Sequence, residues 1–247
     1  MELPFVGDLE QRLTQARDLV TRVGLKAGVG RRYSGRVTAA LSPTGVKQAS
    51  EVMEWAHAYL SRPHPELGRK GAVCPFVPKS INTGRFYLVL HEEIDGTELS
   101  VMRDVLLSHA DGFLERFPHL TPEDEFNSLL MVFPNIPPER GTVVDTIHTE
   151  LKSFLMMKKG IMLSQFHPLA TKGAIRNEKF QAYKSPYPCI VLRHMGVHDI
   201  IFLGHNAQAF SEYHRRFSAR YAKGEIGNEH GYVDLYEAAK KRHGVTT

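Results

Sequence analysis

Four short apolar runs are the feature that most constrains the fold of this chain. They lie within residues 85–91, 128–133, 161–163 and 189–192. Apolar runs of this length, bounded by Gly, Pro and polar residues, are typical of buried strands. Longer segments between and after them carry apolar residues at helical spacing, namely 42–61, 98–117, 142–159, 206–221 and 232–242.

The order of these elements indicates the fold class. Helices and strands are interleaved, but long loops join several strand pairs and the spacing does not repeat as regular βαβ units. We therefore expect an α+β fold, with a mixed or mainly antiparallel sheet covered by several amphipathic helices. A further amphipathic segment over residues 8–23 predicts an N-terminal helical extension over residues 1–30. The remaining residues, 31–247, are expected to form a single α+β domain.

Composition and charge argue against nucleic-acid binding, against a disulfide or zinc framework, and against a membrane or secreted protein. The net charge of +4 is mild and its Lys and Arg residues form no long run, so we expect no nucleic-acid partner. Its two cysteines, Cys74 and Cys189, lack metal-binding spacing, and neither a disulfide framework nor a zinc site is predicted. No stretch of 18 apolar residues and no signal-peptide pattern occurs, so we expect a cytoplasmic protein without membrane contact.

Residues 161–195 carry an unusual density of side chains with functional chemistry. His167 follows the third apolar run and is constrained by Pro168, while Arg193 and His194 leave the fourth run. Functional residues concentrate at strand ends, so these side chains are expected to gather around one site. On the residues alone, a hydrogen-bonded turn histidine and solvent-facing arginines explain the pattern equally well.

Several motifs resemble known families. Cys74-Pro75-Phe76, a following strand at 86–90 and the later His167-Pro168 pair are similar to the YqcI/YcgG-like family, which includes haem-dependent N-oxygenases acting on guanidines and arginine. A closer resemblance is to a domain family of uncharacterised bacterial proteins. It covers roughly residues 40–225 and rests on the segments HPELGR, VCPFVP, QFHP, RN, SP and RHM.

The haem family implies a cofactor and a reaction. The expected cofactor is haem iron, and the expected activity is that of a monooxygenase-type oxidoreductase in a biosynthetic pathway. Its substrate would be a small amine, guanidine or amino acid, oxidised at nitrogen, with an electron donor as a partner. A homodimer is left open.

The resemblance also assigns roles to particular residues. His167 would be the iron ligand, because a neutral imidazole on a proline-constrained turn holds its orientation. Arg176 and Arg193 would pair with the haem propionates, since a guanidinium matches carboxylate geometry. The residues expected to line the haem slot are Phe76, Phe166, Tyr187 and Met195, and the expected catalytic residues are Cys74 and His194.

Three alternatives stay open. Cys74 could replace His167 as the axial ligand, or could simply pack in the core as a small apolar residue. The protein could bind haem or another small ligand without turnover. It could also be an enzyme without haem that uses a Cys74 nucleophile or a mononuclear metal, for which His198, Asp199 and His205 are the right residue types.

Overall fold

The computed structural model describes residues 41–245. The helix expected over residues 8–23, and with it the N-terminal extension, lies outside the described residues. Seven α-helices and a four-stranded mixed sheet are present in the described part, so the predicted α+β class is confirmed. The bounds of the helices and strands are α2 Pro43–Trp55, α3 Val77–Asn82, β1 Phe86–Leu90, α4 Leu99–Arg116, β2 Ser128–Val132, α5 Val143–Phe154, β3 Ile161–Phe166, β4 Cys189–His194, α6 Ile200–Leu203, α7 Ala207–Ala222 and α8 Tyr232–His243.

The sheet has the strand order β1-β2-β4-β3. Strands β1 and β2 are parallel, whereas β4 is antiparallel to both of its neighbours. Strand β3 therefore runs in the same direction as β1 and β2. The carboxyl ends of these three strands meet at one edge of the sheet, and β4 begins at that same edge.

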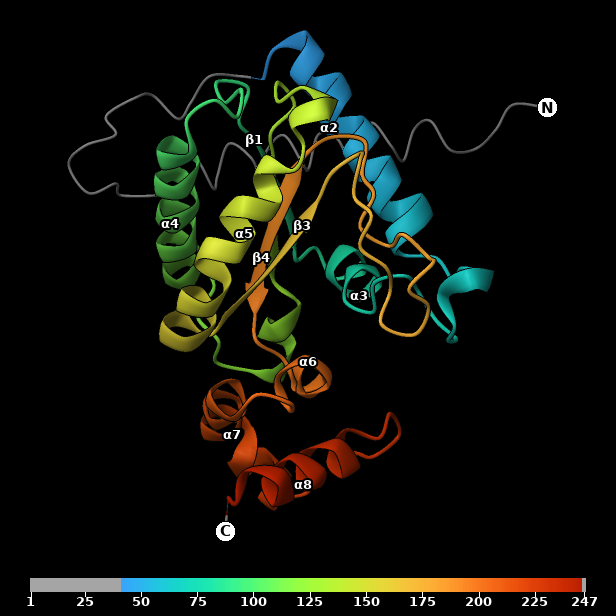
Figure 1. Cartoon of the computed structure of the whole chain (residues 1–247), viewed down its shortest axis with the longest axis vertical. Helices are drawn as coiled ribbons and strands as arrows, with labels where there is room; N and C mark the ends of the chain where they lie inside the picture. Colours follow the sequence, from blue (N-terminus) through green and yellow to red (C-terminus); the bar gives the residue numbers. More distant parts are fainter. Residues whose placement is uncertain (1–40, 246–247) are drawn as a thin grey trace.

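Helices cover both faces of the sheet (Figure 1). Successive side chains of a strand point to opposite faces, and β2 shows this clearly. Leu129 and Met131 belong to the core with α4 and α5, whereas Leu130 and Val132 belong to the core with α2. All five residues of β2 are buried, as expected for a strand that is central and covered on both sides.

The last three helices form a separate cluster beyond the carboxyl end of β4 (Figure 1). Phe210, Tyr213, Phe217 and Tyr236 are its largest buried side chains, and Met195 joins them directly after β4. The Arg193 guanidinium of β4 connects the sheet to this cluster. It makes two hydrogen bonds of 2.7 Å to the carboxylate of Asp199, which is fully buried just before α6.

Local sequence signals explain where the main helices begin and end. Ser42 caps α2 by accepting a hydrogen bond from the N–H of Gly45 over 2.9 Å, and Pro43 occupies the first helical position. Helix α5 continues as a π-helical turn over Leu155–Lys159 and stops at Gly160, whose φ of 64° is left-handed. Strand β3 begins at the next residue, so the chain reverses at Gly160 and β3 packs against α5.

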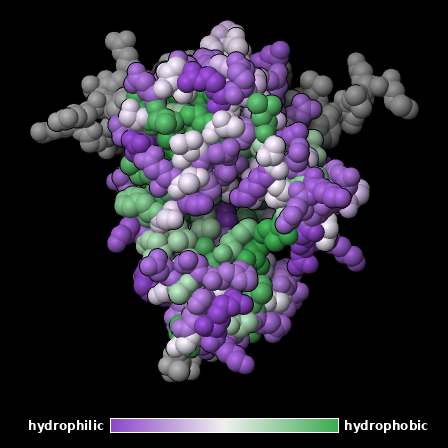
Figure 2. Space-filling view, in the orientation of Figure 1, coloured by the Kyte–Doolittle hydropathy of each residue, from purple (hydrophilic) through white to green (hydrophobic). Residues whose placement is uncertain are grey.

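The surface is mixed in character. Figure 2 shows apolar patches interspersed among polar residues over the face seen in Figure 1. Exposed large apolar side chains include Leu120, Leu169 and Ile175. Among the described residues, no helix combines the length and the apolar character needed to cross a membrane.

Candidate functional site

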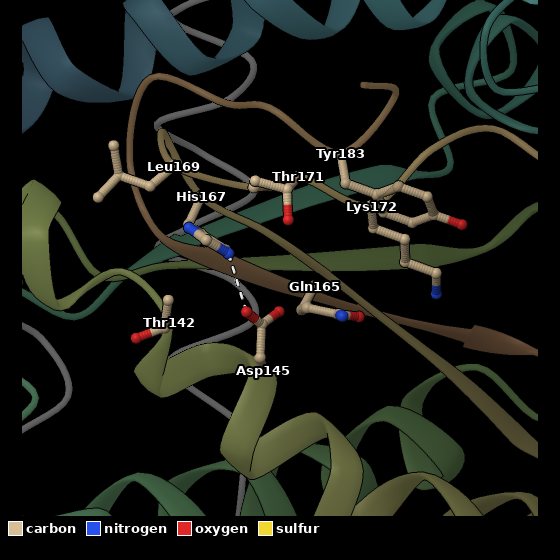
Figure 3. Close-up of a pocket in the computed structure, with 9 residues that line it drawn as sticks. Thr142, Asp145, Gln165, His167, Leu169, Thr171, Lys172 and Tyr183 are labelled. Atoms are coloured by element: carbon tan, nitrogen blue, oxygen red, sulfur yellow. Dashed lines mark hydrogen bonds and ion pairs between the residues drawn. The ribbon is translucent and has the colours of Figure 1, made fainter. Parts of the chain in front are cut away.

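A polar cavity of about 250 Å³ lies where β3 ends and α5 begins. The 3-10 turn Pro138–Arg140 and Gly141 lead into α5, and the loop after β3 closes the opposite side. Figure 3 shows the side chains pointing into this space. The lining residues are Thr142, Asp145, Gln165, His167, Leu169, Ala170, Thr171, Lys172 and Tyr183.

A histidine–carboxylate pair occupies one wall of the cavity. His167 Nε2 donates a hydrogen bond to Asp145 Oδ2 over 2.9 Å, because an ionised carboxylate can only accept (Figure 3). The His167 side chain is 3% exposed, whereas that of Asp145 is 42% exposed. Asp145 also lies in the first turn of α5, where the helix dipole favours a negative charge. The cavity therefore presents a carboxylate that is held from behind by a buried imidazole.

Two polar atoms of this region are buried without a hydrogen-bond partner. They are His167 Nδ1 and Gln165 Oε1. The imidazole packs against Gly141, where an added Cβ would lie 3.1 Å from Nδ1, so there is no room for a ligand on that side. Gln165 instead extends into the cavity between Asp145 and Lys172 (Figure 3). A buried acceptor without a donor costs stability, so a ligand donor that reached this oxygen would recover part of that cost.

Lys172 gives the opposite wall a positive charge. Its ammonium lies 4.6 Å from the ring centre of Tyr183. Burial lowers the pKa of Lys172, the nearby cation of Lys152 lowers it further, and the carboxylate of Asp145 partly opposes both effects. The loop that carries Lys172 is fixed to the end of β3, because the N–H of His167 donates to the carbonyl of Tyr183 over 3.3 Å. The two charged walls thus belong to one connected unit.

His148 supports the cavity from α5. Its Nε2 donates to the carbonyl of Leu163 over 3.2 Å, at the outer edge of β3. Burial lowers the pKa of His148 to about 4, and the cations of Lys152 and Lys172 act in the same direction. The imidazole is therefore neutral at neutral pH. Its hydrogen bond gives the Leu163 carbonyl of the edge strand β3 a partner.

One family model matches residues 49–227, and it describes a domain of unknown function (DUF6875). The chain belongs to this family. The matched segment is more than half of the chain and contains the whole sheet and every residue of the cavity. No curated protein and no solved structure gives a significant match.

In this DUF6875 member, the residues predicted to share a site lie at opposite ends of two neighbouring strands. His167 follows β3, whereas Arg193 and His194 end β4, and these two strands are antiparallel. Ile161 pairs with His194 and Phe166 pairs with Cys189, so the carboxyl ends of the two strands lie about 17 Å apart along the sheet. The structure does not bring His194 and Arg193 to the cavity at His167.

Arg193 and His194 are each engaged at that other end. Arg193 pairs with Asp199, and its guanidinium lies 4.0 Å from the ring centre of Phe76. Buried His194 donates from Nε2 to the carbonyl of Phe117 over 2.6 Å, and burial lowers its pKa to about 4. Together with Met195, these residues form part of the junction between the sheet and the C-terminal helices.

The other predicted residues lie on the α2 side of the sheet or on its loops. Phe166 packs edge-on against Trp55, and the Tyr187 hydroxyl donates to Glu51 over 2.5 Å. Cys74 is half-buried and packs against the core that α2 covers, and Arg176 is exposed on the loop after β3. None of these residues lines the cavity.

This arrangement does not fit a haem held by His167. The imidazole is almost fully buried, its Nε2 is bonded to Asp145, and its Nδ1 faces Gly141. Neither Arg176 nor Arg193 lines the cavity, so no predicted cation could reach a propionate there. The walls are polar and charged, whereas a haem requires an apolar slot.

The residues considered for a non-haem metal lie in the C-terminal part. His198 Nδ1 is 3.5 Å from Asp199, whose carboxylate is already held by Arg193, and His205 Nδ1 lies 3.3 Å from an Arg242 nitrogen. Over residues 41–245, no group of three or more His, Cys, Asp or Glu side chains is arranged to hold a metal ion.

The residues that sequence reasoning missed are those that complete the cavity around His167. Asp145 carried one usable signal, because an acidic residue in the first turn of a predicted helix is often fixed at that helix start. Gln165 belongs to the QFHP segment, but its burial depends on the packing of β3 against α5 and could not be read from that segment. Lys172 lies within the segment 161–195, which is rich in functional side chains, but nothing in the sequence showed that this loop folds back over the strand.

Proposed function

We propose that this protein is an enzyme of small-molecule metabolism that binds an amine-bearing substrate in the His167 cavity and removes a proton from it. The observation that carries this proposal is the partly exposed Asp145 carboxylate backed by the buried His167 imidazole. A cavity of about 250 Å³ suits a metabolite of modest size, since it lies below the volume of sites that bind drug-sized ligands.

The acceptors of the cavity favour a substrate that donates hydrogen bonds. Asp145 uses one carboxylate oxygen for His167, and its other oxygen is free to face a ligand. Gln165 adds a buried amide oxygen without a donor. The exposed carboxylate, together with the amide oxygen buried in the same wall region, matches an ammonium or guanidinium group, because such groups carry several N–H donors around one positive charge.

Lys172 provides a binding partner for a second, anionic group of the substrate. Its ammonium lines the same cavity as Asp145 but belongs to the opposite wall. A molecule with a cationic amine and an anionic carboxylate complements both walls at once, as an amino acid does. The amine, guanidine and amino-acid substrates implied by the family resemblance therefore agree with the charges of this cavity.

The chemistry of the pair is proton transfer. Asp145 would accept the proton as general base, and the His167 N–H would hold the carboxylate in its reactive orientation. Groups that act in this way contribute roughly 10²- to 10⁴-fold to rate. Loss of the proton leaves a lone pair on the substrate nitrogen, which is the prerequisite for any reaction at that nitrogen.

Haem-dependent N-oxygenation, implied by the resemblance, stays a separate proposal. A visible absorption spectrum of protein purified from cells supplied with a haem precursor, recorded before and after reduction, tests it directly. A Soret band that shifts on reduction and on addition of CO would support a haem, and its loss in His167→Ala would support His167 as ligand. A colourless protein that also fails to bind added hemin would remove the haem proposal but leave the proton-transfer proposal intact.

A binding experiment tests the substrate class. L-arginine, L-lysine and L-leucine would be titrated calorimetrically into the full-length protein, each beside its decarboxylated amine and its N-acetyl derivative. At least one amino acid should bind, its N-acetyl derivative should bind at least about 10-fold more weakly, and Asp145→Asn should cause a similar loss. Lys172→Met should abolish the preference for the amino acid over its decarboxylated amine.

Matched controls come from the same loop. Glu178 and Lys179 are exposed and do not line the cavity, so Glu178→Gln and Lys179→Met should leave every affinity unchanged. If Asp145→Asn bound the amino acid as tightly as the unmodified protein, the proposed substrate site would be wrong. Binding without any product after prolonged incubation with candidate oxidants and acceptors would instead indicate a carrier.

A further inference from the structure

Two histidines, His91 and His109, face each other at the carboxyl ends of the strands, away from the cavity. His91 directly follows β1, and its N–H donates to the carbonyl of Val132 over 2.9 Å. Its ring stacks on Phe133 with a centroid distance of 5.6 Å and an interplanar angle of 21°. His109 faces it from the middle of α4. The pair thus joins the first strand to the helix that covers it.

The two imidazoles meet through the same type of atom. His91 Nε2 and His109 Nε2 are 2.9 Å apart, and the ring planes are inclined by 68°. On its other side, His91 Nδ1 lies 2.7 Å from Glu93 Oε1. Because the carboxylate can only accept, it holds the His91 proton on Nδ1 and leaves a lone pair on Nε2, directed at His109.

We propose that the Nε2 atoms of His91 and His109 bind one divalent transition-metal ion between them, with water completing its coordination. In a tetrahedral zinc site with Zn–N distances of about 2.0–2.1 Å, two ligand nitrogens are about 3.3 Å apart. The observed 2.9 Å needs an opening of a few tenths of an ångström. Both rings must also turn, so that their lone pairs point at one ion beside the line that joins the two nitrogens.

Glu93 strengthens this interpretation. A metal-binding histidine almost always donates its second N–H to a carboxylate, a carbonyl or water, which fixes the tautomer and makes the ligand more basic. The Glu93–His91 hydrogen bond is such a contact. The Glu93 carboxylate also places a negative charge beside the pair, which favours a cation over an anion.

The expected ion follows from the ligands. Neutral imidazole suits Zn²⁺, Cu²⁺ and Ni²⁺, whereas Mg²⁺ and Ca²⁺ prefer oxygen. Because no third His, Cys, Asp or Glu of the described chain converges on this point, binding should be weaker than in a closed four-ligand zinc site. An ion here would link the loop after β1 to α4.

This site is independent of the proposed substrate cavity. His91 follows β1 and His167 follows β3, which are the two outer strands of the sheet. With β2 and β4 between them, the outer strands lie about 14 Å apart. Loss of metal binding would therefore leave the amino-acid titrations readable, and each proposal can fail without the other.

The test uses full-length protein that carries no affinity tag and has been freed of metal with a chelator. Zn²⁺ alone is titrated calorimetrically, and Co²⁺ alone is followed by its visible d–d absorption. We expect one ion per chain, and at least about 10-fold weaker binding for His91→Ala and for His109→Ala. His230→Ala is the matched control, because His230 is exposed and distant in sequence from the pair. The Zn²⁺ affinity of this variant should equal that of the unmodified protein.

Two further variants separate metal binding from folding. His109→Gln keeps an amide that can hydrogen-bond to His91 but is a poor metal ligand, and it should lose the ion while the thermal midpoint of the metal-free protein changes little. Glu93→Gln, at a side chain that is 66% exposed, should weaken Zn²⁺ binding about 10- to 100-fold. Absence of a bound ion in the unmodified protein, or unchanged affinity in His109→Gln, would overturn the proposal.

Discussion

The two ends of the β3–β4 strand pair differ in whether their charged groups are paired with one another or border a cavity. At the end where β3 stops, His167 Nδ1 and Gln165 Oε1 are buried without partners beside an open cavity. At the end where β4 stops, Arg193 and Asp199 make two hydrogen bonds of 2.7 Å, and the Asp199 carboxylate also accepts from the N–H of Gly196 over 2.8 Å.

The same contrast extends to the neighbouring groups of the β4 end. Glu125 accepts from Arg220 over 2.5 Å and from the N–H of Val197 over 3.1 Å. His198 Nδ1 and Arg220 Nε have no hydrogen bond, but they lie 3.5 Å and 3.8 Å from the carboxylates of Asp199 and Glu225. Charges paired in this way hold elements together, whereas the partly exposed Asp145 carboxylate beside the cavity is available to a ligand. The β4 end is therefore a structural junction, and the β3 end is the candidate site.

Breaking the junction should have the largest effect on stability. Asp199→Ala leaves the Arg193 guanidinium buried without its partner, and we expect the free energy of unfolding to fall by about 3–5 kcal/mol. Urea denaturation followed by circular dichroism measures this loss. Asp104→Ala, on the exposed face of α4, is the control and should change stability by less than about 0.5 kcal/mol. A loss below about 1 kcal/mol for Asp199→Ala would contradict the junction.

Crowding the histidine of the cavity should have the next largest effect. A Cβ at Gly141 would lie 3.0 Å from His167 Cβ and 3.1 Å from Nδ1, so Gly141→Ala should displace the imidazole from Asp145. We expect a stability loss of about 1–3 kcal/mol, as for other overpacked sites, together with loss of amino-acid binding.

A second glycine provides the comparison for this substitution. A Cβ at Gly227 would meet no atom within 4 Å, so Gly227→Ala should affect neither stability nor binding. Calorimetric titration measures the amino-acid binding of both variants, and urea denaturation measures their stability. Unchanged binding in Gly141→Ala would show that the orientation of His167 does not matter to the site.

Acid should weaken both ends through their buried histidines. Burial lowers the pKa of His148 at the cavity, and of His194 and His198 at the junction, from an ordinary 6.5 to about 4. The unfolded chain therefore binds more protons than the folded one between pH 6.5 and 4, and stability falls as the pH drops through this window. Each such histidine contributes a slope of at most about 1.4 kcal/mol per pH unit.

Substitution separates the contributions of the two ends. His194→Gln and His148→Gln should each flatten the pH dependence of the unfolding free energy between pH 6.5 and 4, measured by urea denaturation at several pH values. His230→Gln, at an exposed position, should leave the slope unchanged. A slope that none of the buried substitutions alters would mean that other groups control the acid response.

The smallest effect on stability is expected at the carboxylate of the cavity. Asp145 is partly exposed, and an asparagine can still accept the hydrogen bond from His167, so Asp145→Asn should cost less than about 1 kcal/mol. Its effect on ligand binding should nevertheless be at least about 10-fold, as proposed above. A stability loss above about 2 kcal/mol would place Asp145 among the structural residues and would remove the contrast between the two ends.

The elements of the fold were predictable because their signals are local. Ser42-Pro43 marks the start of α2, and the apolar runs mark all four strands within two residues, except that β3 extends three residues beyond its run. The predicted helices over 98–117 and 142–159 also match α4 and α5 with its π-helical turn. Capping, proline placement and apolar periodicity act between residues that are close in sequence, so they are readable without a structure.

The candidate site was only partly predictable. His167 was identified because it follows a strand and precedes Pro168, and the structure places it in the cavity wall. Arg193 and His194 satisfied the same rule but lie at the opposite edge. The rule locates functional side chains at strand ends, but it cannot say which ends meet, because that depends on the direction in which two strands pair.

The amino-acid sequence by itself determined the α+β class, the places where helices and strands begin, and the position of His167 after a buried strand. Tertiary structure alone decided that β3 and β4 are antiparallel, that Asp145 of α5 reaches His167 and that Lys172 faces them from a returning loop. The physical reason is the range of the forces involved. Backbone propensity and capping act within a few residues, whereas pairing direction and the burial of polar groups are set by contacts between distant segments.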